Sequence, residues 1–214
     1  METRAEEKWI TCFERVFEMS GVASGDLVGI LSESLSRPVL VELADRGLQR
    51  RGARVVRIQV PTPPLKEPVP VRSTGSTTAF EGYDDLLSGL GGCSLVVDCT
   101  VEGLLHAKER DVLLQAGTRV FMISNEHPEI LERCMPDPGL QPKVDQALAM
   151  LSGASTMQVT SDAGTDLQVN VADAPTRGGA GFLGPEDKVA YWPAGLCLCF
   201  PLENSVNGKV VLDV

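Results

Sequence analysis

His106 and His127 are the two histidines of this chain, and imidazole is the side chain best suited to move protons near neutral pH. His106 follows the apolar run 95–99, so we expect it just beyond the carboxyl end of a parallel strand. Open α/β sheets form their ligand clefts at that edge. A capping or packing role at the start of the next helix is the alternative for His106. His127 lies beside Asn125, a candidate helix cap, and Pro128, which suits a first helical turn, so a structural role is favoured.

The six cysteines are scattered and include no C-x-x-C pair. Cys197 and Cys199 are two positions apart, so a strand would place both on one face, where two thiolates could share a metal. Two small hydrophobic side chains in a buried strand are the favoured interpretation. Because no histidine spacing completes a three- or four-ligand set either, we predict no metal site within this chain. Unpaired cysteines and a charged N-terminal segment favour a reduced, cytoplasmic protein.

Charge and motif content exclude several other classes of function. The net charge is −10 and the sequence pI is about 4.7, so the surface repels nucleic-acid phosphates, and the arginines at 46, 50, 51 and 54 suit the end of a helix instead. The glycines at 178–181 do not fit a dinucleotide-binding turn, and P-loop and G-x-S-x-G elements are absent. An ordinary loop is favoured over a lid for residues 174–184. No apolar run approaches the roughly 18 residues of a membrane span.

The elements that must position His106 alternate along residues 1–152. Apolar spacing predicts helices at 6–19, after Pro38, at 83–90, at 107–116 and at 143–152, with Ser34 or Ser36 as candidate caps for the second. Continuous apolar runs predict strands at 27–31, 53–60, 94–99 and 119–123. Strands of this kind, separated by helices, are typical of a parallel sheet covered on both faces. We therefore predict a doubly wound, Rossmann-like α/β domain.

Residues 153–214 have a different character. The segments 156–160 and 166–171 alternate apolar and polar residues around a turn at 161–164, which predicts a hairpin. Further strands are expected at 196–200 and 209–212. These patterns predict a smaller β-rich unit, and its end at Val214 without a closing helix suggests an incomplete domain.

Several of these segments resemble the 2,5-dihydroxypyridine 5,6-dioxygenase family, over nearly the whole chain. The marks are Ser20-Gly21-Val22, the strand 27–31 with Ser36-Arg37-Pro38, residues 94–98 with Leu104-Leu105-His106, and 116–119. The most specific run is Tyr191-Trp192-Pro193-Ala194-Gly195, followed by 201–205 and 207–214. The family is similar in fold to the aminopeptidase T metallopeptidases, whose counterparts here are 164–167 and 193–195. In those peptidases a metal-binding glutamate comes next, whereas this chain has Leu196, which favours the dioxygenase.

The resemblance implies an Fe(II)-dependent enzyme that opens a hydroxylated pyridine with O2. The iron ligands of the family lie in its C-terminal part and have no counterpart here, so it implies that the chain is an N-terminal portion that binds no iron and is inactive by itself. Residues 153–214 would then begin a truncated C-terminal metal-binding domain. The resemblance also implies a homo-oligomer that binds a small aromatic N-heterocycle and O2. Nucleic-acid and membrane partners are not expected, because of the acidic charge and the lack of a long apolar run noted above.

Three site residues are carried over from this resemblance. His106 matches a family histidine that assists catalysis, so it would carry a proton to or from the ring hydroxyl or the bound oxygen species. Tyr191 aligns with a second family histidine, and Tyr191 and Trp192 would bind substrate by shaping an aromatic pocket from the second unit. The alternative functions are a metallo-aminopeptidase of the aminopeptidase T type and a non-catalytic assembly module.

Overall fold

A computed structural model describes residues 4–64 and 74–212. The chain divides into two compact units, Met1–Pro136 with Gly181–Ala194 (unit 1) and Asp137–Ala180 with Gly195–Val214 (unit 2). This division does not follow the expected boundary at residue 152, because helix α6 (Gln141–Ser152) belongs to unit 2 and residues 181–194 return to unit 1.

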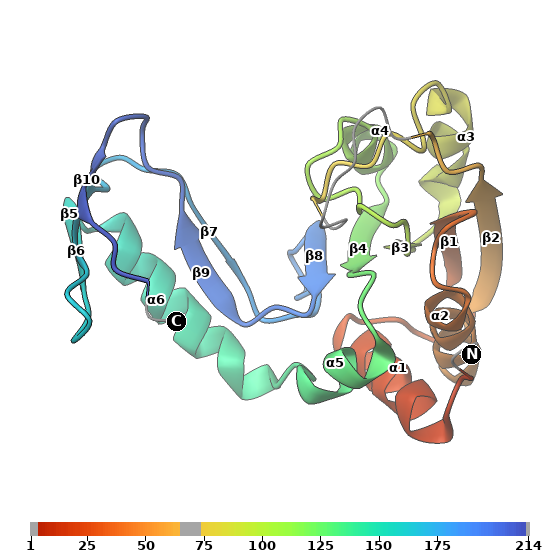
Figure 1. Cartoon of the computed structure of the whole chain (residues 1–214). Helices are drawn as coiled ribbons and strands as arrows, with labels where there is room; N and C mark the ends of the chain where they lie inside the picture. The colour runs from red at the N-terminus through yellow and green to blue at the C-terminus, as the bar shows by residue number, and fades with distance from the viewer. Residues whose placement is uncertain (1–3, 65–73, 213–214) are drawn as a thin grey trace. The chain divides into compact units, whose positions relative to one another are not determined.

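Unit 1 is built on a five-stranded sheet in which all neighbouring strands are parallel, in the order β2-β1-β3-β4-β8 (Figure 1). The strands are β1 (Leu27–Glu33), β2 (Arg54–Val60), β3 (Leu95–Asp98), β4 (Arg119–Ile123) and β8 (Val189–Trp192). The predicted parallel α/β sheet is therefore confirmed, with β8 as an additional edge strand. The chain reverses its direction of strand addition between β1 and β3, so the topological switch point lies between their carboxyl ends.

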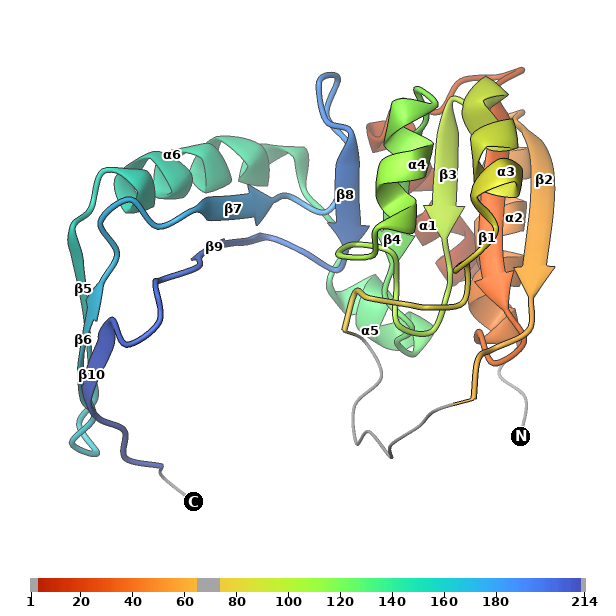
Figure 2. The same ribbon diagram turned by 90° about the horizontal axis from the view of Figure 1, so that it is seen from above.

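Helices cover both faces of this sheet (Figures 1 and 2). One face carries α1 (Glu7–Met19), α2 (Pro38–Arg50) and α5 (Pro128–Arg133), and the other carries α3 (Asp84–Ser88) and α4 (Glu109–Gln115). A 3-10 turn, η1 (Gly89–Gly92), follows α3. Pro38 begins α2 as predicted, but neither expected serine caps it, and the Ser36 hydroxyl instead accepts a hydrogen bond from the Glu33 backbone N–H.

Two hydrophobic clusters fill the space between the sheet and these helices. Successive strand residues point to opposite faces, so Val97 and Phe121 pack with α1 and α2, whereas Val96 and Val120 pack with α3 and α4. The first cluster also contains these aromatic and aliphatic side chains, all at most 1% exposed: Phe13, Phe17, Leu40, Leu43, Leu48 and Trp192.

Unit 2 combines helix α6 with short strands. The predicted hairpin is confirmed as β5 (Thr156–Thr160) and β6 (Asp166–Asn170), and β10 (Val206–Lys209) pairs antiparallel with β6. β7 (Thr176–Gly179) pairs antiparallel with β9 (Leu196–Cys199), so the expected loop at 174–184 contains a strand. The strand predicted at 209–212 was placed wrongly, since β10 ends at Lys209. Several large apolar side chains of this unit are exposed, among them Phe200, Leu202 and Leu212.

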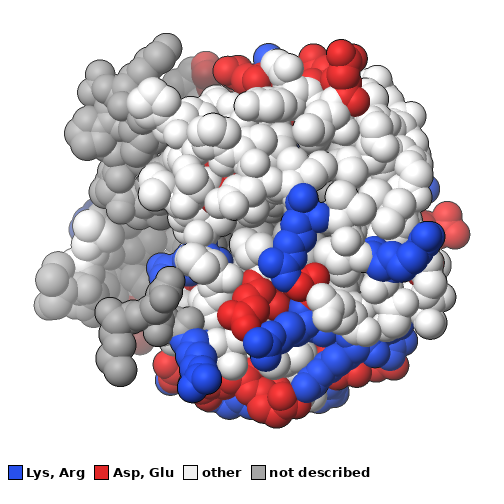
Figure 3. Space-filling model, turned by 90° about the vertical axis from the view of Figure 1, so that its right-hand side faces the viewer, with Lys and Arg blue, Asp and Glu red and all other residues white. Residues whose placement is uncertain are grey.

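The arginines near the end of α2 are paired with carboxylates. Arg46 contacts Glu42, Arg50 contacts Glu7 and Glu14, and Arg51 contacts Glu18. Figure 3 shows this part of the surface, with Lys and Arg interspersed among Asp and Glu. Within the described residues, 4–64 and 74–212, no helix is long and apolar enough to cross a membrane.

Candidate functional site

A pocket of about 250 Å³ opens at the carboxyl edge of the unit 1 sheet. It lies beyond the ends of β3, β4 and β8, where parallel sheets characteristically bind ligands. The residues that line it all belong to unit 1 and are Thr74, Gly75, Leu105, His106, Met122, Ser124, Tyr191 and Pro193.

His106 reaches this pocket from the end of the segment 99–106, which we call the β3 loop. The His106 backbone N–H donates to the Gly75 carbonyl at 2.5 Å, and the Gly75 N–H donates to the Glu102 carbonyl at 2.6 Å. A third bond of 2.8 Å runs from the Thr77 N–H to the Gly103 carbonyl. These bonds hold the β3 loop against the segment that precedes α3. The His106 side chain is exposed, so its imidazole is accessible to a ligand.

Gly75 fits where a larger residue would not. Its φ is +74°, in the left-handed region that glycine favours. A Cβ at this position would lie 2.9 Å from Cδ2 of His106 and 3.2 Å from Cβ of Leu105. Gly75 therefore permits the close approach of backbone and imidazole that forms one wall of the pocket.

Asp98, the last residue of β3, organises the β3 loop from inside. Its carboxyl oxygens accept hydrogen bonds from the Thr100 N–H (3.0 Å), the Thr100 hydroxyl (2.7 Å) and the Leu104 N–H (2.5 Å). The side chain is fully buried, and this burial raises the pKa of Asp98 although the hydrogen bonds oppose the rise. Asp98 therefore connects the beginning of the β3 loop with the residues just before His106.

A second buried carboxylate, Glu33, closes the topological switch point. It ends β1, is 1% exposed, and accepts a 2.7 Å hydrogen bond from the Val101 N–H. The β3 loop thus occupies the crevice between the ends of β1 and β3. The pocket is displaced towards β4 and β8.

Tyr191 and Trp192 end β8 and point to opposite faces of the sheet, as neighbouring strand residues must. Tyr191 lines the pocket, and burial raises the pKa of its phenol. Trp192 is 0% exposed, packs edge-to-face on Phe13 with ring centroids 5.0 Å apart, and donates from Nε1 to the Cys134 carbonyl. Trp192 thus lies in the hydrophobic core and is not among the residues that line the pocket. Both residues belong to unit 1, whereas the sequence pattern placed them in the second unit.

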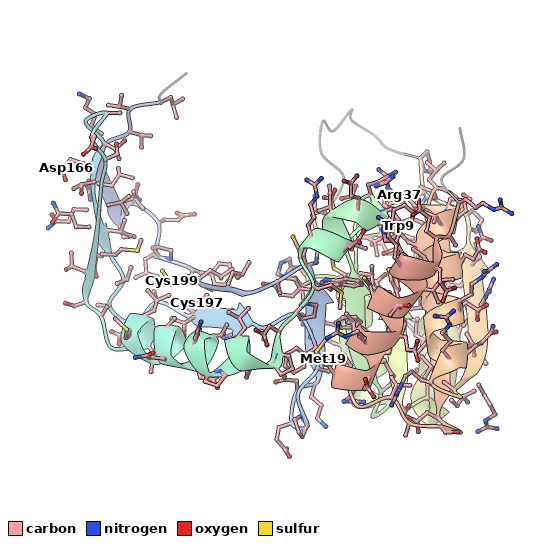
Figure 4. The ribbon with its side chains drawn as sticks, turned by 90° about the horizontal axis from the view of Figure 1, so that it is seen from below. Trp9, Met19, Arg37, Asp166, Cys197 and Cys199 are labelled. Atoms are coloured by element: carbon pink, nitrogen blue, oxygen red, sulfur yellow. The ribbon has the colours of Figure 1, made fainter. Side chains whose placement is uncertain are left out.

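The remaining candidates are placed away from this pocket. His127 caps α5 by accepting a hydrogen bond at Nδ1 from the Glu129 N–H, in agreement with the structural role favoured above. Its ring makes a T-shaped contact with that of Trp9, with ring centroids 5.7 Å apart. Trp9, the ring that His127 contacts, lies on α1 (Figure 4). Cys197 and Cys199 are half-buried on β9 in unit 2. In the part of the chain that the structure describes, no group of three or more His, Cys, Asp or Glu side chains could hold a metal ion.

Asp98, Glu33 and Gly75 were not singled out in the sequence. The available signal for the two carboxylates was an acidic residue at the end of each of two apolar strands, where burial forces a carboxylate to find hydrogen-bond donors. Gly75 gave no such signal, because its role depends on a contact with a residue about thirty positions later.

The parallel sheet, with its helices on both faces and its pocket at the carboxyl edge, defines unit 1 as an open α/β ligand-binding fold. The chain belongs to the family described as NicX, 2,5-dihydroxypyridine 5,6-dioxygenase, whose family model matches residues 8–214. The resemblance seen in the sequence is thereby confirmed.

The 2,5-dihydroxypyridine 5,6-dioxygenase of Pseudomonas putida KT2440 is 31% identical over 209 residues, which cover 94% of this chain and 57% of the relative. The solved structure of 2,5-dihydroxypyridine dioxygenase from the same organism matches with a TM-score of 0.82 and 28% identity, over 96% of this chain and 59% of that one. Wild-type AmpT from Thermus thermophilus matches with a TM-score of 0.52 and 14% identity, over 94% of this chain and 63% of that one, a likeness of fold alone. This chain spans less than three fifths of the Pseudomonas relative.

Proposed function

We propose that this chain supplies the ring-binding pocket of an enzyme that opens a hydroxylated pyridine, such as 2,5-dihydroxypyridine, with O2. The observation that carries the proposal is the meeting of His106 and Tyr191, from distant parts of the sequence, in one pocket at the carboxyl edge of the sheet. The named activity of the family supplies the substrate class.

The pocket suits a small aromatic ring with polar substituents. Leu105 and Met122 offer apolar surface to the faces of a ring, and His106 and Tyr191 offer polar groups to its edge. Its volume of about 250 Å³ is below the roughly 300–1,000 Å³ of pockets for drug-sized ligands. A single substituted ring is therefore the favoured occupant.

His106 and Tyr191 would have different roles toward that ring. An imidazole can take a proton from a ring hydroxyl and return it near neutral pH, which is the role we propose for His106. Burial raises the pKa of Tyr191, so its phenol stays protonated at neutral pH. We therefore propose that Tyr191 donates a hydrogen bond to a ring oxygen or nitrogen and does not act as a base.

The family name implies an oxygen-activating metal, and the pocket does not provide a ligand set for one. One imidazole and one phenol fall short of the three protein ligands that mononuclear iron oxygenases use. Among the residues that the structure describes, no acidic or thiol side chain lines the pocket beside them. The proposed roles of this chain are therefore limited to ring binding and proton transfer.

Calorimetric titration of the purified full chain with 2,5-dihydroxypyridine under anaerobic conditions tests this proposal. We expect one saturable site, with weaker binding in Tyr191→Phe by about two- to tenfold, the value of one hydrogen bond. His106→Ala should also weaken binding. His127→Ala is the matched control, because it removes the other imidazole from a helix cap outside the pocket.

Unsubstituted pyridine and alanyl-alanine serve as comparison ligands in the same titration. We expect both to bind more weakly than the dihydroxypyridine. Pyridine lacks the hydroxyl groups at the edge of the ring, and the dipeptide lacks a flat ring. Saturable binding of the dipeptide without binding of the dihydroxypyridine would contradict it and favour a peptidase.

A further inference from the structure

The β3 loop is held by a small set of buried hydrogen bonds that converge on two side chains. Asp98 accepts from the Thr100 N–H, the Thr100 hydroxyl and the Leu104 N–H. The Thr100 hydroxyl oxygen in turn accepts from the Gly103 N–H at 3.1 Å. Asp98 and Thr100 are 0% and 1% exposed, so water does not compete for these bonds.

The same bonds determine where His106 lies. Leu104, which donates to Asp98, is two residues before His106, and its carbonyl accepts from the Ala107 N–H at 3.1 Å. The Gly103 N–H donates to the Thr100 hydroxyl, and the Gly103 carbonyl accepts from the Thr77 N–H. Thr77 lies in the same segment as Gly75. The backbone before His106 is therefore tied to Asp98 directly at Leu104 and through Thr100 at Gly103. The backbone after His106 is tied to it through the Leu104 carbonyl.

We propose that Asp98 is a positioning residue for His106, because its buried carboxyl fixes the β3 loop in the conformation that presents the imidazole to the pocket. Asp98 does not line the pocket and acts only through the loop. This inference rests on the proposed role of His106 in ring binding and proton transfer.

Asn at position 98 separates this role from simple packing. The amide has nearly the shape of the carboxyl, but one of its two terminal atoms is an NH2 donor. Whichever way the amide is turned, its NH2 group faces a backbone N–H, either that of Leu104 or that of Thr100. Asp98→Asn therefore breaks the loop anchor while it leaves the volume of the core unchanged.

The chain contains two histidines, so the experiment has an internal reference. In a ¹H–¹³C spectrum of the imidazole Cε1–H groups, recorded without ligand, we expect Asp98→Asn to shift or split the His106 signal and to leave that of His127 unchanged. The dissociation constant for 2,5-dihydroxypyridine should rise by about two- to tenfold, as for the loss of one hydrogen bond.

Thr118→Val is the matched control for a general loss of stability. Thr118 is 1% exposed and donates a 2.8 Å hydrogen bond to the Leu90 carbonyl, just before the amino end of β4 and at the edge of the sheet opposite the pocket. The Thr118→Val substitution removes one buried hydrogen bond and leaves the contacts of the β3 loop unchanged. We expect both histidine signals to stay in place in this variant.

A second pair of variants covers the case in which Asp98→Asn does not fold. Thr100→Ser keeps the hydroxyl that donates to Asp98, and Thr100→Val removes it. The inference expects a displaced His106 signal in Thr100→Val and a retained one in Thr100→Ser.

Three outcomes would overturn the inference. They are an unmoved His106 signal in folded Asp98→Asn, an unmoved signal in Thr100→Val, and an equal displacement in Thr118→Val. If the wild-type chain binds no dihydroxypyridine while Asp98→Asn still moves the His106 signal, the proposed function fails and the positioning role stands.

Discussion

Cys99 and Cys134 have opposite environments in the same unit. Cys99 is 1% exposed, and burial, together with the neighbouring Asp98, raises the pKa of its thiol far above the usual range. Cys134 is exposed. Because the thiolate is the reactive form, we expect iodoacetamide at pH 8 to alkylate Cys134 in the native chain and to spare Cys99.

Peptide mass spectrometry after a short alkylation pulse measures this difference. The same pulse in denaturant, where all six cysteines should react, is the control. If Cys99 is alkylated as fast as Cys134 in the native chain, the prediction is wrong, and the β3 loop, which begins at Cys99, opens to the reagent.

The buried carboxyl of Asp98 leads to a second prediction, about how the stability of the folded chain depends on pH. Because burial raises the pKa of Asp98 in the folded chain above the ordinary value of 3.8, folding favours its neutral form. The stabilisation from this group is present below about pH 3.8 and is lost as the pH rises through the raised folded-state pKa. Asp98→Asn cannot ionise, so the stability advantage of the wild type over Asp98→Asn should shrink as the pH rises.

Urea unfolding of both proteins at several pH values from 4 to 8 measures this trend. An advantage of the wild type that grows with pH would mean that the hydrogen bonds to the ionised carboxylate outweigh its burial.

At this scale the sequence predicts some residues and misses others for physical reasons. His106 could be placed at the cleft edge because it follows a buried strand. The alternation along β8 explains why Tyr191 lines the pocket and the adjacent Trp192 does not. Thr100 could not be recognised, because its importance lies in hydrogen bonds within a loop whose path the sequence does not reveal. Asp98 carried only the signal of an acidic residue at the end of an apolar strand, which does not show the backbone groups that it binds.

At the scale of elements, α1 and α2 are the most closely packed helices, and Gly47 lies between them. A Cβ at Gly47 would lie 2.9 Å from Cβ of Phe13 and 3.0 Å from the backbone nitrogen of Glu14. Gly47→Ala gains about 1 kcal/mol in helix propensity but overpacks this contact at a cost of about 1–3 kcal/mol. We expect a net loss of up to about 2 kcal/mol in the free energy of unfolding.

Gly89→Ala is the matched control, since a Cβ there meets nothing within 4 Å and the φ of Gly89 is −63°. Thermal and urea unfolding should find this variant unchanged or slightly more stable. A Gly47→Ala variant that is as stable as Gly89→Ala would show that α1 can move away from α2 without cost.

The strands of unit 2 show why sequence patterns placed some elements incorrectly. The glycines of β7 suggested a loop, but a Cβ at Gly178 would lie 2.9 Å from the Leu196 carbonyl oxygen, so glycine lets β7 approach β9. β10 lies earlier than predicted because its register is set by β6, with Val206 opposite Val169. In both cases a partner strand decides the structure, and the local pattern does not contain that information.

At the scale of the whole molecule, unit 1 depends on a segment that returns from late in the sequence. Residues 181–194 supply β8, and Trp192 fills a space against Phe13 in the main hydrophobic cluster. The alternation of strands and helices predicted the parallel sheet, but it did not predict this return, because β8 is short and follows a β-rich segment.

Trp192→Ala tests this dependence. Removal of a fully buried tryptophan costs about 3–5 kcal/mol, so we expect a much lower urea midpoint for loss of the helical circular dichroism signal. Leu202→Ala, at a residue that is 73% exposed in unit 2, should leave the midpoint nearly unchanged. Equal midpoints for the wild type and Trp192→Ala would mean that unit 1 folds without β8.

In the proposed complex, a hydroxylated pyridine binds against His106 and Tyr191. Intermolecular nuclear Overhauser effects between 2,5-dihydroxypyridine and the isotopically labelled full chain test it most directly. We predict contacts from the ring protons to the His106 imidazole and the Tyr191 ring, with none to His127. Ring contacts confined to other residues, or a ligand that leaves the His106 signal unchanged at saturation, would contradict the account.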